Sequence, residues 1–290
     1  MLNKRRLGSE IKKQRKIKKL TQKQLAFEIC DQSEISRIEA GDFFPNLDIL
    51  YLISNRLQTS VSYFFEVLTH ENVEETSNIR NKISTITLSK NYEELRRYTD
   101  NIMRENKVWH PEVEKFLKYK NLLARYYIKE IDYRYCLIEF QILLSQTTSG
   151  MDVLLDFQIK NSIANILAEN KIYDKSMELY EEILNENLKV KEADKLKIKA
   201  FFNYGKLLYL KQEYEDALVQ ANKGIELSIE TGDMTILGQF YFEKASIMEK
   251  LLHDNLEISA NYKRAQFFFR LLNLNKHLEI LEEKKGGFLL

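Results

Sequence analysis

Apolar side chains recur at intervals of three and four residues along most of the chain, which is the spacing of amphipathic helices. In residues 1–68 this pattern predicts five short helices that share one core, with inward positions such as Leu7, Leu25 and Leu50. Helix breakers are scarce, because the 290 residues include only two prolines and nine glycines. The sequence therefore predicts an all-α protein.

Polar residues predict where the helices of this first block begin and end. Thr21 is expected to cap the second helix, and Asp31 with Glu34 has the spacing of a capping box before the third. Gly41 is expected to end the third helix, because glycine adopts the left-handed C-terminal conformation at the least cost. The fifth helix is expected over residues 61–68.

The rest of the chain repeats a helical hairpin at regular intervals. Four tight turns each end in a tyrosine (Tyr92, Tyr133, Tyr173 and Tyr214), so the successive spacings are 41, 40 and 41 residues. Such a period indicates an α-solenoid. We expect five hairpins and a capping helix, over residues 72–106, 111–146, 152–188, 193–230, 234–272 and 274–285.

Small and large residues alternate within these hairpins in a way that is similar to tetratricopeptide repeats. Two sets of residues show this rhythm: Ala164, Ser176 and Tyr180, then Gly205, Ala217 and Ala221. The usual repeat has about 34 residues, so these longer hairpins are degenerate. The last residues, 286–290, are expected to fray, with docking of their apolar end on the solenoid as the alternative.

Charge is distributed unevenly along the chain. Residues 1–70 hold twelve Lys/Arg and eight Asp/Glu, a net of +4, whereas residues 71–290 hold 32 and 35, a net of −3. A basic surface attracts phosphate, although a solvated lysine-rich helix would have the same composition. We expect two domains, a DNA-binding domain over residues 1–68 and a TPR-like domain over residues 72–285.

Several classes of protein are disfavoured by what the sequence lacks. Cys30 and Cys136 lie far apart and show no metal-ligand spacing, so neither a disulfide framework nor a metal site is expected. No apolar run is long enough for a signal peptide core or a membrane span. The four histidines are scattered, and neither a glycine-rich phosphate loop nor an H-E-x-x-H motif occurs. We expect a cytoplasmic protein that is not an enzyme and needs no cofactor.

A helix-turn-helix motif lies within the first block. It reads T-Q-x-x-L-A over residues 21–26, then S-x-I-S-x-I-E-x-G over residues 33–41, and Pro45 follows. Over about 65 residues this block resembles the XRE family of phage-repressor-like DNA-binding domains. The turn before the third helix is one residue shorter than in many members. The resemblance implies that Gln22 bonds a DNA phosphate and that Arg15 pairs with Glu39 to tie the first helix to the third.

The third helix carries the side chains that are expected to contact DNA. Gln32, Ser33 and Arg37 are the candidates for base contacts, because glutamine pairs with adenine and arginine with guanine. Ser36 is assigned to a phosphate, and the alternative for Ser33 is a helix cap. One helix reads only a few base pairs, so we expect a homodimer on an inverted repeat, with half-sites about 34 Å apart.

Polar and aromatic residues recur on the first helix of successive hairpins. The concave side of a solenoid suits an extended peptide, whose backbone needs both donors and acceptors, as amides provide. The expected peptide-binding residues are Asn161, Asn165, Asn203, Tyr204, Gln239 and Tyr241. The alternative is that the amides hold helices together and the aromatic rings belong to the core.

The whole chain resembles the Rap/Rgg/NprR/PlcR/PrgX family of quorum-sensing peptide receptors from Gram-positive bacteria, and in particular its PlcR-like transcription regulators. Residues 7–13, 32–39, 163–166 and 265–269 carry the likeness. Members bind a short re-imported signalling peptide in the concave groove, and the matching amides are Asn161, Asn203 and Gln239. His277 departs from the pattern of PlcR-like members. The resemblance implies a transcription regulator, and activation is the expected direction of regulation. It also implies that peptide binding changes the curvature of the solenoid.

Two other functions remain open from the sequence. One is a DNA-binding repressor whose solenoid recruits a protein in place of a peptide. The other is a phosphatase acting on response regulators, because some relatives of this solenoid have that activity.

Overall fold

The computed structural model describes residues 3–69, 73–105, 107, 109–146, 153–186 and 191–290. These residues form α-helices and one short 3₁₀ helix, and no β-strand occurs among them. The predicted all-α fold is therefore confirmed. The chain divides into two compact units, Met1–Ala124 and Arg125–Leu290.

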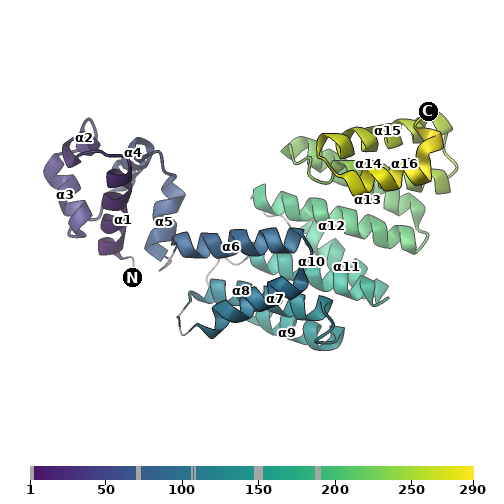
Figure 1. Ribbon diagram of the computed structural model, residues 1–290, viewed down its shortest axis with the longest axis horizontal. Helices are drawn as coiled ribbons and strands as arrows, with labels where there is room; N and C mark the ends of the chain where they lie inside the picture. The colour runs from purple at the N-terminus through teal and green to yellow at the C-terminus, as the bar shows by residue number, and fades with distance from the viewer. Residues whose placement is uncertain (1–2, 70–72, 106, 108, 147–152, 187–190) are drawn as a thin grey trace. The chain divides into compact units, whose positions relative to one another are not determined.

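The first unit begins with a block of five helices around one core. They are α1 (Lys4–Ile17), α2 (Gln22–Ala26), α3 (Gln32–Ala40), α4 (Leu47–Leu57) and α5 (Val61–Thr69) (Figure 1). Each contributes side chains to the core, including the fully buried Leu7, Leu25, Ile35, Ile53 and Phe64. The predicted five-helix block is confirmed.

The helix ends in this block follow the sequence with one exception. Thr21 Oγ1 accepts a hydrogen bond from the Gln24 backbone N–H at 3.2 Å, and Gly41 ends α3 with φ of 80°. Asp31 occupies the N-cap position of α3, but its side chain makes no capping bond, so the predicted Asp31–Glu34 capping box is wrong. The Glu34 N–H already donates to the Asp31 carbonyl at 2.9 Å, and that backbone bond replaces the side-chain cap.

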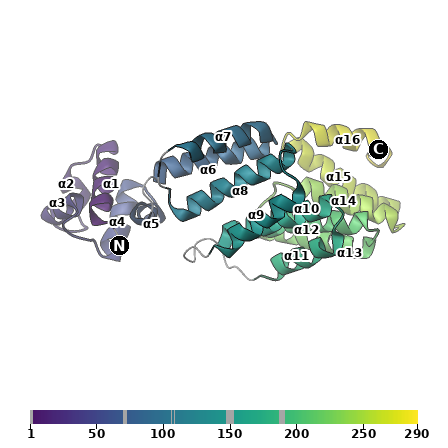
Figure 2. The same cartoon turned by 90° about the horizontal axis from the view of Figure 1, so that it is seen from below.

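Three further helices of the first unit lie side by side in both views (Figures 1 and 2). They are α6 (Val73–Leu88), α7 (Tyr92–Arg104) and the first part of α8 (Pro111–Tyr127). Asn121 on α8 donates from Nδ2 to Thr99 Oγ1 on α7 at 2.9 Å. Buried polar contacts of this kind fix how neighbouring helices pack.

The second unit continues as helical hairpins. Its elements are the end of α8, then α9 (Tyr133–Ser145), α10 (Val153–Glu169), α11 (Tyr173–Asn185), α12 (Lys191–Leu210), α13 (Tyr214–Thr231), α14 (Leu237–Lys250), α15 (Asn255–Leu271) and α16 (Asn275–Lys285). The predicted hairpins and capping helix agree with these bounds to within a few residues. Each described helix is too short or too polar to cross a lipid bilayer.

The turns inside the hairpins share one backbone conformation. Lys90, Lys129, Lys171 and Gln212 have positive φ between 54° and 66°. A left-handed residue reverses the chain at a helix C-terminus, so the next helix begins soon afterwards, two residues later in three of these turns and four residues after Lys129. It begins at Tyr92, Tyr133, Tyr173 and Tyr214, as the turn pattern predicts.

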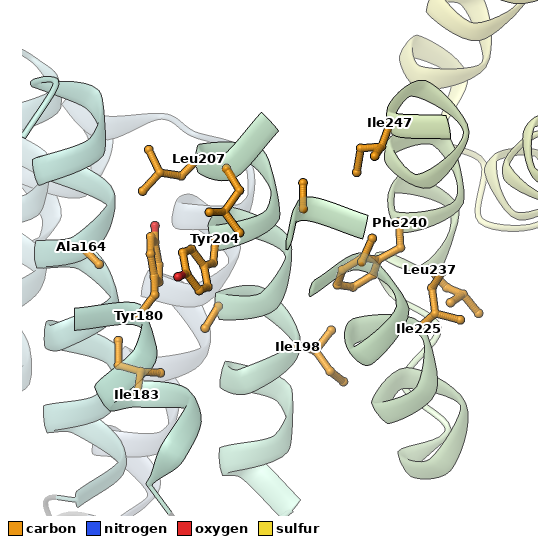
Figure 3. Packing of buried hydrophobic residues seen from close by; sticks show 14 of the residues in the cluster. Ala164, Tyr180, Ile183, Ile198, Tyr204, Leu207, Ile225, Leu237, Phe240 and Ile247 are labelled. Carbon is orange, nitrogen blue, oxygen red and sulfur yellow. The ribbon is translucent and has the colours of Figure 1, made fainter. Parts of the chain in front are cut away.

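The core of the second unit runs through successive hairpins (Figure 3). Tyr180 on α11 stacks on Tyr204 on α12, with ring centroids 5.6 Å apart. Small residues allow the helices to approach, because Ala164, Ala217 and Ala221 are almost fully buried. Ser176 Oγ donates to the Ala164 carbonyl at 2.8 Å. These contacts explain the alternation of small and large residues in the sequence.

The C-terminal residues are packed against α15, so the predicted fraying of residues 286–290 is wrong. Gly286–Phe288 form the 3₁₀ helix η1. Ser259 Oγ donates to the Phe288 carbonyl at 2.6 Å, and the Phe288 ring lies 5.5 Å from that of Tyr262. The contact of the partly buried Phe288 with the buried Tyr262 outweighs the chain entropy that favours fraying.

Candidate functional site

The outer face of α3 presents the four polar side chains that were expected to contact DNA. Gln32, Ser33, Ser36 and Arg37 are all exposed, and positions i, i+1, i+4 and i+5 share one side of a helix. Buried Ile35 and Ile38 face the core, so they fix the rotation of α3 about its axis. The helix therefore offers a compact polar surface with one positive charge.

A chain of hydrogen bonds connects α1, α2 and α3 behind this surface. Arg15 Nε and Nη2 donate to the two Glu39 carboxylate oxygens at 2.5 and 2.9 Å. Gln22 Nε2 donates to Glu39 Oε2 at 2.9 Å, and Gln32 Nε2 donates to Gln22 Oε1 at 2.9 Å. The expected structural pair and two expected DNA contacts thus belong to one network, which orients Gln22 and Gln32 before any ligand arrives.

The carboxylate of Glu39 stays ionised within this network. Burial opposes its ionisation, but the hydrogen bonds from Arg15 and Gln22 and the charge of Arg15 outweigh burial and lower the pKa of Glu39. Arg15 also donates from Nη1 to the Leu20 carbonyl at 2.8 Å. The bidentate pair therefore anchors α3 to α1 across 24 residues of sequence.

Arg37 is held at the edge of the α3 surface by an aromatic contact. Its guanidinium carbon lies 5.2 Å from the centroid of the Phe43 ring. A cation over a ring face is attracted to it without using its N–H donors. Arg37 thus keeps these donors for an acceptor outside the protein.

In the second unit, two of the expected peptide-binding amides have unsatisfied acceptors. Asn161 lies on α10, Asn203 on α12 and Gln239 on α14, so they occupy the first helices of successive hairpins. Asn161 Oδ1 and Gln239 Oε1 are buried and accept no hydrogen bond from any residue that the structure describes. A buried acceptor without a donor costs about 1–3 kcal/mol. A ligand N–H at each oxygen would remove that cost.

The other three expected groove residues already have partners within the protein. Asn165 Oδ1 accepts from the Tyr180 hydroxyl at 2.5 Å. The Tyr204 hydroxyl donates to Glu181 Oε1 at 2.8 Å, and the Tyr241 ring stacks on Phe268 with centroids 5.9 Å apart. These side chains build the wall of the solenoid, and their contact with a ligand stays a prediction.

Gln239 also lines a pocket of about 210 Å³ between α12, α14, α15 and α16. Three phenylalanines and an isoleucine line it together with four polar side chains: the lining residues are Phe202, Lys206, Gln239, Phe242, Glu243, Phe269, His277 and Ile280. Burial raises the pKa of Glu243 to about 8, and the nearby Lys206 offsets part of that effect. At neutral pH the Glu243 carboxyl is therefore mainly a neutral hydrogen-bond donor.

The sequence alone did not single out Lys206, Glu243 or Phe269. Glu243 follows Gln239 by four positions and Lys206 follows Asn203 by three, so each shares a helix face with an amide that was predicted. That spacing was the available signal. This spacing could not predict that α12 and α16 line the same pocket, because more than 60 residues separate the two helices in sequence.

Comparison with known proteins identifies both parts of the chain. The RNPP family C-terminal domain matches residues 80–290, and a helix-turn-helix domain matches residues 11–64. No curated protein matches the chain.

Solved structures give the same result over the full length. The chain is similar to Bacillus thuringiensis PlcR in complex with the peptide PapR7 and DNA, with 37% identity over 97% of this chain and 100% of that one, and a TM-score of 0.84. The apo form of that PlcR has 36% identity, coverage of 96% and 98%, and a TM-score of 0.70. ComR from S. thermophilus, in complex with DNA and its signalling peptide ComS, is 17% identical over 98% and 100%, with a TM-score of 0.60. The last likeness is one of fold alone.

Proposed function

Because this chain belongs to the RNPP family, we propose that it is a transcription regulator that binds double-stranded DNA and responds to a short signalling peptide. Residues 1–68 are the DNA-binding domain, and residues 72–285 bind the peptide and carry the dimer contacts. The expected direction is activation, and the expected location is the cytoplasm.

The DNA-binding role is assigned to the outer face of α3. Gln32, Ser33 and Arg37 contact bases, because their donors and acceptors match the edges exposed in a major groove. Gln22 and Ser36 bond phosphates. Arg15 and Glu39 touch no DNA and keep α3 in place through their buried pair. The basic charge of the amino-terminal residues adds attraction to phosphate that weakens as salt rises.

The peptide-binding role depends mainly on one observation, the two buried acceptors of Asn161 and Gln239, to which no described residue donates. An extended peptide carries backbone N–H groups that fit such acceptors. Asn203 supplies a third amide from α12, which comes between α10 and α14 along the chain. Asn165, Tyr204 and Tyr241 are assigned further peptide contacts, and the pocket beside Gln239 accepts a peptide side chain.

The two activities are coupled in a homodimer that binds an inverted repeat. Peptide binding favours one curvature of the solenoids and thereby one spacing of the two α3 helices. A peptide shifts this equilibrium only by its differential affinity for the two forms. A coupling of about 1–3 kcal/mol corresponds to a roughly 5–150-fold change in DNA affinity.

Two variants with opposite phenotypes test the proposal. Peptides retained by the purified protein from spent culture medium are identified by mass spectrometry, and DNA sites are selected from a random pool. Arg37→Ala should weaken binding to the selected DNA by about 1–3 kcal/mol and retain the peptide. Asn203→Ala should lose the peptide and keep basal DNA binding.

Each variant is the control for the other, because either one losing both activities would indicate misfolding. If the solenoid retains a protein and no peptide, the peptide assignment is wrong and the solenoid recruits a protein partner. If neither variant changes either binding activity, the residue assignments are wrong.

A further inference from the structure

A stripe of side chains on α8 combines aromatic rings with positive charge. Glu112, Phe116 and Lys120 follow one another at intervals of four residues, so they lie on one face of the helix. Arg80 reaches this face from α6: Arg80 Nη2 lies 2.6 Å from Glu112 Oε1, and its guanidinium carbon lies 4.7 Å from the Phe116 ring centroid. All four residues belong to the first unit.

Lys120 shares the Phe116 ring with Arg80, but no carboxylate in the described part of the chain pairs with it. Its Nζ lies 5.6 Å from the Phe116 centroid and 4.5 Å from the Tyr119 centroid. Among the residues that the structure describes, none gives Lys120 an ion pair, since Glu112 is paired with Arg80. The side chain is half-buried, so water and small solutes still reach it.

The surroundings of Lys120 disfavour its charge. Burial, followed by repulsion from Arg80, lowers the pKa of Lys120 to about 8. Proteins normally pair a desolvated ammonium or leave it in water. Lys118, two residues away on the same helix, is exposed, so its ammonium is in water. Lys120 is half-buried and no described residue pairs with it, so its positive charge is less favourable here than in water.

We propose that Lys120 and Arg80 form a binding site for a carboxylate group of a ligand. Arg80 uses one of its five N–H donors on Glu112 and keeps others for a second acceptor, while Lys120 contributes a recessed ammonium. The Phe116 ring lies against both cations and the Tyr119 ring against Lys120, which reduces their contact with water and strengthens their attraction for an anion. The carboxylate comes either from the end of a peptide or from a small organic acid, which share this chemistry. The site does not depend on the proposed peptide contacts of the second unit.

Thermal unfolding in sodium succinate and in sodium chloride, at equal ionic strength and pH 7, tests the site on the full-length protein. Succinate should raise the midpoint of the wild type by about 2 °C or more above chloride. Lys120→Met should remove this difference. It should also raise the midpoint in chloride, because an apolar side chain replaces an unpaired recessed charge. A merely structural lysine would give the opposite sign in chloride.

Two further variants guard against misfolding and general salt effects. Lys118→Met should keep the full response to succinate, because its ammonium is in solvent. Lys120→Arg should keep at least part of the response, because it retains the charge. No added stabilisation of the wild type by succinate, or an undiminished response in Lys120→Met, would overturn the proposal, as would an equal loss in Lys118→Met.

A second pair of probes separates the two sources of the carboxylate. N-acetyl-trialanine is added as the free acid or as its C-terminal amide. Stabilisation by the free acid and not by the amide assigns the site to a peptide terminus. Stabilisation by succinate alone assigns it to a small organic acid. Stabilisation by the amide to the same extent as the acid would contradict a carboxylate site.

Discussion

Glu243 shows how the fold changes the chemistry of a single side chain. Burial raises its pKa from 4.5 to about 8, so the folded protein holds this proton where the unfolded chain has released it. The resulting stabilisation is complete below pH 4.5 and is lost as the pH rises through 8. As the pH rises from 5 to 8, we expect the ionisation of this group to lower the free energy of unfolding by on the order of a few kcal/mol.

Glu243→Gln tests this expectation, because glutamine has a similar shape and does not titrate. Urea unfolding of the variant should depend less on pH between 5 and 8 than that of the wild type, and the variant should gain relative stability at pH 8. Glu230→Gln, at an exposed carboxylate on α13, should follow the wild type. An unchanged pH dependence in Glu243→Gln would show that Glu243 ionises normally.

The buried pair between α1 and α3 controls the position of the recognition surface. Glu39→Ala leaves the Arg15 guanidinium buried without its carboxylate and removes the partner of Gln22. We expect the free energy of unfolding to fall by about 3 kcal/mol, measured by chemical denaturation. Asp42→Ala, at an exposed carboxylate just after α3, should change it by less than about 0.5 kcal/mol.

A double variant separates the charge from the packing at this position. Arg15→Met with Glu39→Met removes both charges and keeps apolar volume, so it should be more stable than Glu39→Ala alone. Equal destabilisation in the single and double variants would mean that the shape of the pair, and not the unpaired charge, determines the loss.

Two helical glycines in the second unit should respond in opposite directions to the same substitution. A methyl group at Gly224 on α13 would lie 2.1 Å from Phe240 Cζ, whereas one at Gly205 on α12 would have its nearest neighbours at 3.7 Å. Gly224→Ala should therefore destabilise the protein by about 1–3 kcal/mol. Gly205→Ala should stabilise it by about 0.5–1 kcal/mol, because alanine favours the helix. Thermal unfolding of both variants checks the signs, and a gain in Gly224→Ala would contradict the close contact of α13 with Phe240.

At the scale of helices, local sequence signals predict where most of the helices begin and end. Thr21, Gly41 and the turn tyrosines such as Tyr133 mark helix ends through short-range chemistry, so the bounds followed. The predicted side-chain cap at Asp31 is wrong because the Glu34 N–H donates to the Asp31 backbone carbonyl and not to its side chain. Phe288 and Glu243 were unreadable for another reason, since their partners Tyr262 and Lys206 lie tens of residues away. Local pattern predicts where helices are, and tertiary contact decides which side chains they bring together.

At the scale of the whole molecule, the proposed mechanism requires two recognition helices to act together. One α3 helix contacts only a few base pairs, so much of the affinity comes from occupying both half-sites of the inverted repeat. In this mechanism, peptide acts on the spacing of the two helices and not on the contacts of either one. Its effect should therefore appear only on DNA that offers both half-sites.

This distinction is measurable with two DNA duplexes, one carrying the selected inverted repeat and one with a scrambled half-site. Saturating peptide should raise affinity for the first by roughly 5–150-fold and leave affinity for the second unchanged, as fluorescence anisotropy would show. By linkage, the intact duplex should raise peptide affinity by the same factor, and Asn203→Ala should abolish both effects. An equal response on both duplexes would mean that peptide alters each DNA-binding domain by itself, because a single half-site cannot report on spacing.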